Sequence, residues 1–185
     1  RHICDKSNLK LVFNLNKNLV LTGMMGVGKS TIGKKLAKNL KFKFIDIDQV
    51  IEKRERKKIN EIFKDKGESY FRKVEEKITL EFLSRKKLVI SLGGGSFLNK
   101  SVRRDVLAGS ISIWLDSSVK SILKRLKNIK KRPLLDKDNL EQSINKIYSV
   151  RKKIYNRANY RVKCDLLEEE KIIKKIVKLY ENSKN

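Results

Sequence analysis

The feature that most constrains this chain is a glycine-rich segment between a short apolar run and a helical pattern. Residues 23–30, GMMGVGKS, match G-x-x-x-x-G-K-[ST] at every defined position. They follow the β-like run 18–22 and open the helical pattern of 30–40. In that context, backbone amides and a helix N-terminus surround phosphate oxygens. A chance glycine turn is the alternative, but the strand–loop–helix context argues against it. The chain is therefore expected to bind a nucleoside triphosphate.

The rest of the chain continues this alternation of short β-like runs and helical patterns. Strands are expected at 18–22, 42–47, 88–92, 110–115 and 160–164, and helices at 30–40, 68–85, 117–126, 139–156 and 168–180. The alternation predicts the α/β class, with a five-stranded parallel sheet in a three-layer α/β/α arrangement. We expect residues 18–185 to form this single domain after a leader of residues 1–17.

The charge is strongly positive, with 46 Lys and Arg against 21 Asp and Glu, a formal net charge of +25. A nucleic-acid partner is one interpretation. The basic residues form no single block, however, and they are interleaved with acidic ones, which favours solvated lysine-rich surfaces. We therefore expect no nucleic-acid partner, and a positive field that attracts anionic substrates.

Composition also excludes several kinds of chemistry. The only histidine, His2, leaves no basis for Ser-His-Asp or Cys-His catalysis or for a histidine metal cluster. Cys4 and Cys164 match no metal spacing; a disulfide between them stays open, and reduced thiols are the simpler interpretation. The longest uncharged stretch, 88–99, is too short to span a membrane, and the N-terminal residues lack the apolar core of a signal peptide. We expect a cytoplasmic protein without a membrane partner.

Two groups of polar residues can act on the phosphates. Lys29 is expected to reach the β- and γ-phosphates, and the Ser30 hydroxyl to bind Mg²⁺. Asp46 and Asp48 come at the end of the second expected strand, where alternation turns both carboxylates to one side. One could hold Mg²⁺ through water and the other accept a proton from a substrate hydroxyl. The alternative for Asp48 is a helix N-cap.

Two further motifs are compatible with either structure or binding. Arg72 and Glu75 are three residues apart on an expected helix, which allows an ordinary surface ion pair. Glu75 could instead hold Arg72 rigid for two-pronged binding of a carboxylate or phosphate. Gly93-Gly94-Gly95 after the third expected strand is either a loop or a backbone surface that a small ligand can approach closely.

Taken in order, these motifs resemble those of the shikimate kinase family. The resemblance rests on the glycine-rich loop, Asp-x-Asp after the second strand, Phe71-Arg72-x-x-Glu75, Gly93-Gly94-Gly95, the lid-like Arg132-Pro133-Leu134-Leu135, and Arg151 followed by Tyr155. It covers about residues 18–180. The triple glycine combined with Phe-Arg-x-x-Glu is more specific than the phosphate loop, which many unrelated kinases share.

The resemblance implies a P-loop kinase of the nucleoside-monophosphate-kinase-like type with a mobile lid at about 127–138. Such an enzyme transfers the γ-phosphoryl group of ATP to the 3-hydroxyl of shikimate, with Mg²⁺, in aromatic amino acid biosynthesis. The implied catalytic residues are Lys29, Asp48 and Arg132. The implied nucleotide contacts are Gly26, Val27, Gly28, Lys29, Ser30, Thr31, Arg125 and Arg132. The implied shikimate contacts are Asp48, Arg72, Gly94 and Arg151, and the implied Mg²⁺ contacts are Ser30 and Asp46. A monomer is expected.

Some features depart from the family pattern, and three other functions compete with it. Lys152-Lys153-Ile154 stands where many members have a proline, and 165–168 carries no clear adenine motif. One rival is another small-molecule kinase of this fold, for gluconate or a nucleoside monophosphate, which the triple glycine and Phe-Arg-x-x-Glu oppose. A nucleic-acid-binding P-loop protein lacks support from any groove-reading motif. An inactive kinase-like protein is opposed by the presence of every expected polar residue.

Overall fold

The computed structural model describes residues 17–126, 139–165 and 167–183. The expected lid with Arg132, and all of the expected leader except Lys17, lie outside the described residues. Five strands form one parallel sheet in the order β2-β3-β1-β4-β5. The strands are β1 (Asn18–Thr22), β2 (Lys43–Asp46), β3 (Leu88–Ser91), β4 (Ser110–Asp116) and β5 (Tyr160–Lys163). The predicted α/β class with a five-stranded parallel sheet is confirmed.

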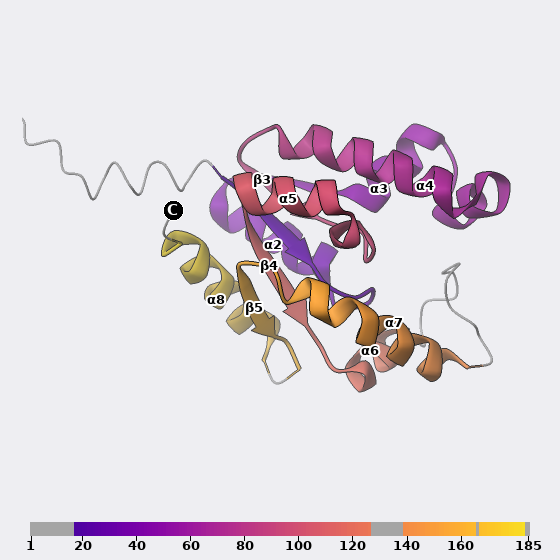
Figure 1. Ribbon diagram of the computed structural model, residues 1–185. Coiled ribbons are helices and arrows are strands. Elements are labelled where there is room, and N and C mark those ends of the chain that lie inside the picture. Colours follow the sequence, from indigo (N-terminus) through magenta and orange to yellow (C-terminus); the bar gives the residue numbers. More distant parts are fainter. Residues whose placement is uncertain (1–16, 127–138, 166, 184–185) are drawn as a thin grey trace, which may run out of the picture.

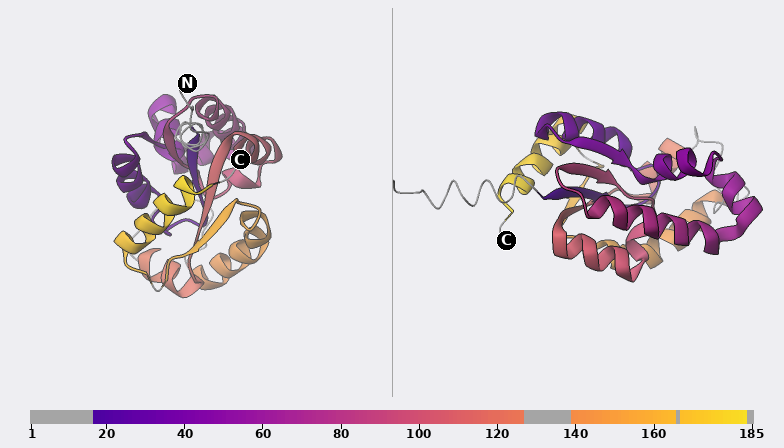
Figure 2. Two further views of the ribbon diagram at one scale, coloured as in Figure 1. Left: turned by 90° about the vertical axis from the view of Figure 1, so that its left-hand side faces the viewer. Right: turned by 90° about the horizontal axis from the view of Figure 1, so that it is seen from above.

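Helices cover both faces of this sheet (Figure 1). On one face α2 (Lys29–Leu40) packs beside α8 (Glu169–Glu181), and on the other α4 (Ile59–Leu83) packs beside α5 (Lys100–Gly109). Figure 2 shows these two helical layers with the strands between them. The remaining helices are α3 (Ile47–Glu55), α6 (Val119–Leu126), α7 (Leu140–Tyr155) and the short 3₁₀ turn η1 (Ser96–Leu98).

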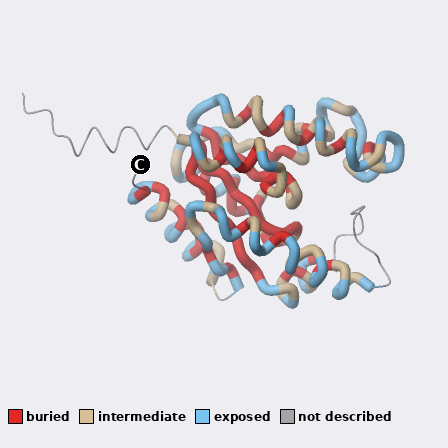
Figure 3. Tube along the Cα trace, viewed as in Figure 1, coloured by how far each residue is buried: buried red, intermediate tan, exposed pale blue. Residues whose placement is uncertain are grey.

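The core is centred on the strands. Every residue of β1, β3 and β4 is buried, because these strands have neighbours on both edges and helices on both faces. Figure 3 shows the buried residues concentrated along the sheet, while the outward sides of the helices are exposed. The largest fully buried side chains include Trp114, Tyr155 and Tyr180. Among the described residues, no helix is long and apolar enough to cross a membrane.

Two helices were not predicted, and a third starts earlier than expected. α3 buries only Ile47 and Ile51, and a helix there entered only as the N-cap alternative for Asp48. α5 is also short; Asn99 caps it by accepting a hydrogen bond from the Val102 amide at 3.1 Å. α4 begins at residue 59 rather than 68. The expected start coincides with a kink at Gly67, whose backbone is non-helical at φ 76° and ψ 171°.

Asn18 joins the first strand to the turn that precedes β3. It is 2% exposed, its amide donates to the carbonyls of Leu83 (3.3 Å) and Arg85 (2.7 Å), and its side-chain oxygen accepts from the Leu88 amide (3.0 Å). The bond to the Leu88 amide is buried and the two bonds to the carbonyls are part-buried, and all three backbone groups would lose their side-chain partner if the amide were removed.

We expect Asn18→Ala to lower the free energy of unfolding by about 1–3 kcal/mol, because the buried Leu88 amide is left unpaired. Urea unfolding followed by circular dichroism measures it. Asn39→Ala is the matched control: its exposed amide donates only to Lys35 within α2, so the loss should stay below about 0.5 kcal/mol. Equal losses in the two variants would contradict the assignment.

Candidate active site

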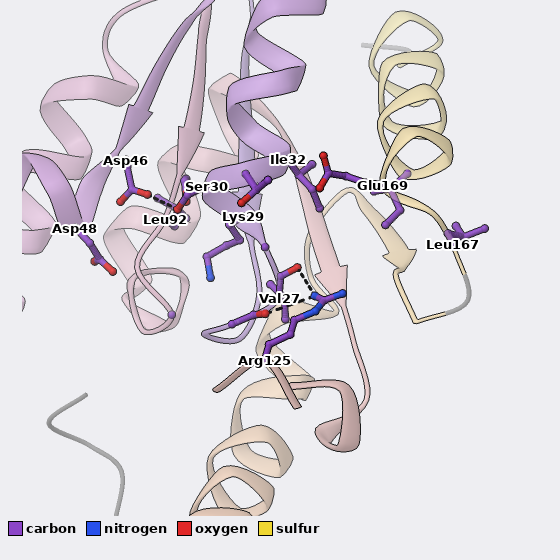
Figure 4. A pocket seen from close by; sticks show the side chains of 16 residues that line it. Val27, Lys29, Ser30, Ile32, Asp46, Asp48, Leu92, Arg125, Leu167 and Glu169 are labelled. Carbon is purple, nitrogen blue, oxygen red and sulfur yellow. Dashed lines mark hydrogen bonds between the residues drawn. The ribbon is translucent and has the colours of Figure 1, made fainter. Parts of the chain in front are cut away.

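A pocket of about 450 Å³ lies at the carboxyl ends of the strands, where open parallel sheets bind their ligands. The phosphate loop and the start of α2 form its floor (Figure 4). Its lining contains Gly26, Val27, Gly28, Lys29, Ser30, Thr31, Asp46, Asp48, Gly94 and Arg125. These residues are the predicted nucleotide and metal contacts within the described chain, together with two of the four predicted shikimate contacts.

The phosphate loop has the backbone form that its glycines predict. Gly26 and Gly28 have φ values of 76° and 93°, in a region of backbone conformation that residues other than glycine rarely adopt. Gly28 stands at the N-terminus of α2, whose partial positive charge favours an anion. The Lys29 ammonium is almost fully buried and donates to the Gly23 and Met24 carbonyls, both at 2.9 Å. The lysine therefore lies across the loop beside the phosphate-binding amides.

Asp46 and Asp48 both line the pocket, but by a different route from the one predicted. The predicted strand was too long: β2 ends at Asp46, and Asp48 lies in the first turn of α3. The N-cap is Asp46, which accepts from the Gln49 amide at 3.4 Å, so the N-cap alternative for Asp48 is wrong. A tight strand-to-helix turn, rather than alternation along a strand, directs both carboxylates to the pocket.

The Ser30 hydroxyl and the Asp46 carboxylate provide a candidate site for a hard cation. The hydroxyl donates to the Asp46 carboxylate at 2.5 Å beside the phosphate loop. One hydroxyl and one carboxylate suit Mg²⁺, which usually takes few protein ligands and fills its shell with phosphate oxygens and water. The described part of the chain holds no cluster of three or more Asp, Glu, His or Cys side chains that could bind a metal.

The opposite end of the pocket is formed by Arg125, Leu167 and Glu169 (Figure 4). Arg125, from α6, donates to the Val27 carbonyl at 3.0 Å, which ties its guanidinium to the phosphate loop. Glu169 begins α8 and forms an ion pair with Lys35 of α2. The pocket thus extends from the two aspartates to an apolar and charged rim contributed by α6, by Leu167 and by the start of α8.

A second pocket, of about 330 Å³, adjoins the first at the triple glycine and contains the predicted arginines. Arg72 of α4 and Arg151 of α7 both line it. Arg72 donates to Glu75 at 2.6 Å and to Glu68 at 3.0 and 3.2 Å. Partial burial opposes the charge of Arg72, but the two glutamates outweigh it and raise the pKa of the guanidinium. The pocket is therefore lined by a permanently charged fork.

The Arg72–Glu75 pair is not the ordinary surface ion pair that the spacing also allowed. The Glu75 side chain is only 3% exposed, and its second oxygen accepts from the Ser96 hydroxyl. A buried carboxylate is stable only when its oxygens are paired. Glu75 thus fixes Arg72 to the segment that follows the triple glycine.

The triple glycine brings the protein's own side chains close to the backbone. A Cβ on Gly95 would lie 2.6 Å from an Arg72 nitrogen, and one on Gly94 would lie 3.2 Å from an Arg151 nitrogen. A Cβ on Gly93 would come within 2.8 Å of an Asp48 oxygen. The segment is therefore the meeting point of three predicted substrate side chains.

Gly94 also binds α7 through its carbonyl. Arg151 donates to that oxygen at 2.9 Å, and the Tyr155 hydroxyl donates to it as well. Burial raises the pKa of Tyr155 to about 12, so the hydroxyl stays a neutral donor at physiological pH. Arg151 is 8% exposed, which makes its guanidinium a built-in part of the wall rather than a surface cation.

Sequence reasoning missed Glu68 and Ser96, which line the second pocket, and the contact of Tyr155 with the Gly94 carbonyl beside it. Glu68 has a helical signal, because it lies four residues before Arg72. Ser96 follows the triple glycine directly, but nothing in a single sequence pairs it with Glu75. Tyr155 was noted only as a neighbour of Arg151, and its helical spacing of four residues is the signal that both side chains share one face of α7. Arg132 lies outside the described residues.

Comparison with known proteins gives one consistent result. The family model described as shikimate kinase matches residues 25–181. A shikimate kinase from Persephonella marina is 43% identical over 161 residues, which cover 87% of this chain and 97% of that protein. A shikimate kinase from Sulfurihydrogenibium sp. is 42% identical over 161 residues, with 87% and 96% coverage.

Solved structures agree with the sequence comparisons. A shikimate kinase from Acinetobacter baumannii in complex with shikimate aligns with a TM-score of 0.86 and 33% identity, covering 91% of this chain and 94% of that one. A gluconokinase from Sinorhizobium meliloti aligns with a TM-score of 0.56 and 18% identity, over 90% and 94% of the two chains. At that identity the gluconokinase shows the shared fold alone.

We expect Gly95→Ala to lower the unfolding midpoint, because the new methyl group would overlap the Arg72 guanidinium and strain its pairing with buried Glu75. The expected loss is about 1 kcal/mol, since the displaced atoms are the end of a long side chain and only the pairing with Glu75 resists their shift. Gly109→Ala is the matched control, since a Cβ there meets nothing within 4 Å. Urea unfolding of both variants provides the measurement, and a Gly95→Ala protein as stable as the control would contradict this packing.

Proposed function

The chain belongs to the shikimate kinase family, and we propose that its two adjoining pockets divide the family's reaction between nucleotide and acceptor. The enzyme is an ATP-dependent kinase that acts on an alcohol group: it transfers the γ-phosphoryl group of ATP to the 3-hydroxyl of shikimate, giving shikimate 3-phosphate and ADP. This reaction serves aromatic amino acid biosynthesis. The proposal concerns which residues of this chain perform it.

The observation that carries the proposal is that two arginines line one pocket, which adjoins the pocket of the phosphate loop. Shikimate has one carboxylate and three ring hydroxyls. Arg72 and Arg151 line the second pocket and can neutralise a carboxylate, with Arg72 held as a fork by its glutamates. Asp48 and Gly94 line the adjoining phosphate pocket, so a small ring between the two pockets would present a hydroxyl to the phosphates.

On the nucleotide side, residues 26–31 would surround the phosphates of ATP with backbone amides. The Lys29 ammonium would neutralise charge on the β- and γ-phosphates as the phosphoryl group leaves. Arg125 would lie along the nucleotide, next to the loop carbonyl that it already contacts. By family resemblance, Arg132 would contribute a second cation at the phosphates.

Ser30 and Asp46 would hold Mg²⁺, Ser30 directly and Asp46 through water. When bound, the cation would neutralise phosphate charge and orient the phosphoryl group. The chain itself supplies the positioning of the acceptor, which accounts for much of the catalysis of phosphoryl transfer.

On the acceptor side, Asp48 would bind ring hydroxyls and accept the proton of the 3-hydroxyl as that oxygen bonds to phosphorus. The bond between phosphorus and the bridging oxygen of ADP breaks in the same step. Asp48 is suited to this role because it lies in the first turn of α3 at the shared edge of the pockets.

The function is tested by coupled ADP release with ATP and Mg²⁺, with shikimate, gluconate or AMP as acceptor. We expect turnover with shikimate alone. Lys29→Ala should lower kcat by on the order of a hundredfold or more, because electrostatic stabilisation of the transition state is lost. Lys34→Ala, an exposed lysine on the same helix, is the control and should keep kcat within about twofold. Turnover with gluconate or AMP but not with shikimate would contradict the assignment of shikimate as the acceptor.

We expect Arg72→Lys to raise the KM for shikimate about tenfold or more while the KM for ATP changes less than about twofold, because an ammonium cannot form the bidentate pair. Steady-state kinetics with each substrate varied in turn provides the measurement.

Arg54→Lys is the matched control, since Arg54 also forms a two-pronged pair, with Glu81 at 2.6 and 2.9 Å, on an exposed surface. It should leave both KM values unchanged. An unaltered shikimate KM in Arg72→Lys would disprove the role of Arg72.

A further inference from the structure

Helix α7 is attached to the sheet by a contact outside both pockets. The Tyr148 hydroxyl donates to the Asp116 carboxylate at 2.7 Å. Asp116 is the last residue of β4, so this bond ties the middle of α7 to the carboxyl end of a buried strand. Neither residue lines either of the pockets described above.

The acceptor of this bond is itself held rigidly. The Asp116 side chain is 8% exposed, and its other oxygen accepts from two nitrogens of Arg161 on β5, at 2.7 and 3.0 Å. The Arg161 guanidinium also lies 4.6 Å from the centroid of the Trp114 ring. Both carboxylate oxygens thus have donors, which a buried carboxylate requires. These hydrogen bonds hold the Asp116 carboxylate in one position at the end of β4.

The same face of α7 carries Arg151, which lines the second pocket, and Tyr155. Arg151 and Tyr155 follow Tyr148 by three and seven residues, which places the three side chains in one row along the helix. At one end of the row Tyr148 binds Asp116, and further along Arg151 and Tyr155 bind the Gly94 carbonyl. The Tyr155 ring also contacts Trp114, with centroids 6.1 Å apart.

This arrangement fixes the rotation of α7 about its own axis. Arg151 and Tyr155 hold one part of the row at the Gly94 carbonyl, and the Tyr148–Asp116 bond is a second directional contact on the same face. α7 also packs against α6 and η1, where side-chain packing tolerates small rotations better than a directional hydrogen bond does. A rotation would swing the Arg151 guanidinium away from Gly94 and from the pocket that it lines. Displacements of about 1 Å in positioning groups can change rates a hundredfold.

We propose that Tyr148 is a positioning residue for the acceptor substrate: by donating its hydroxyl to Asp116 it sets the rotation of α7 and thereby the placement of Arg151. This inference rests on the proposed role of Arg151 in binding the shikimate carboxylate. It gives Tyr148 no contact with either substrate.

The test is Tyr148→Phe, which keeps the ring and removes only the hydroxyl. We expect the KM for shikimate to rise about three- to tenfold, while the KM for ATP stays within about twofold. A general loss of structure would instead raise both KM values or lower the amount of folded enzyme. Steady-state kinetics and thermal unfolding of the full chain distinguish these results.

Tyr180→Phe is the matched control, because its buried hydroxyl also makes a tertiary hydrogen bond, to the Lys17 carbonyl at 2.7 Å, away from both pockets. It should lower stability to a similar degree without changing the shikimate KM. If Tyr180→Phe raised the shikimate KM as much as Tyr148→Phe does, the effect would reflect general destabilisation and the proposal would be overturned.

A second measurement tests whether Tyr148 acts through Arg151. Equilibrium binding of shikimate is compared in Tyr148→Phe, Arg151→Lys and the double variant. We expect the double variant to bind shikimate about as weakly as Arg151→Lys alone. Once Arg151 has been replaced, a shift of α7 has no correctly placed arginine left to displace. Fully additive losses would overturn the coupling.

The outcomes separate this inference from the proposed function. If the parent chain phosphorylates shikimate and Tyr148→Phe keeps its shikimate KM, the inference is wrong and the function stands. If the parent chain does not phosphorylate shikimate, the proposed function is wrong and the inference falls with it.

Discussion

The second pocket depends on one buried negative charge, the carboxylate of Glu75. Removing a carboxylate from water is costly unless both oxygens are paired, and here Arg72 pairs with one oxygen and Ser96 with the other. The requirement acts in both directions, since the pairing that stabilises Glu75 also immobilises the Arg72 guanidinium that lines the second pocket. Loss of one partner from such a pair typically costs about 3–5 kcal/mol, which makes the site and the stability of α4 inseparable.

The two pockets form one site because the loops after β1, β2 and β3 meet at the same edge of the sheet. The loop after β1 supplies the glycine-rich segment, the turn after β2 supplies Asp46 and Asp48, and the loop after β3 supplies the triple glycine. Gly94 connects these elements to α7, because its carbonyl accepts from Arg151 and Tyr155. A parallel sheet places strand ends side by side, so residues that are remote in sequence become neighbours without any long loop.

The features that could be predicted from the sequence are those that depend on residues close together in the chain. The phosphate loop, the five strands and the family resemblance were accessible because glycine spacing and apolar periodicity are local signals. α3 and α5, which each bury only two apolar residues, were not among the expected helices, and α3 entered only through the N-cap alternative for Asp48. Asp48 was expected at the end of a strand, whereas the first turn of α3 places it in the lining of the first pocket. The Ser96–Glu75 contact joins residues 21 apart, which no periodicity reveals.

The break at Gly67 has a consequence for how this enzyme tolerates changes in length. Gly67 leaves helical geometry, so the turns before it and the turns after it do not share one continuous helical phase. A residue inserted into the 59–66 segment need not alter the direction in which Arg72 points. The same insertion between Arg72 and Glu75 would rotate the Arg72 guanidinium by about 100° around the helix axis relative to Glu75, since each residue of an α-helix turns by that amount. Length variation among related chains should therefore be tolerated on the outer side of this glycine and be absent between Arg72 and Glu75.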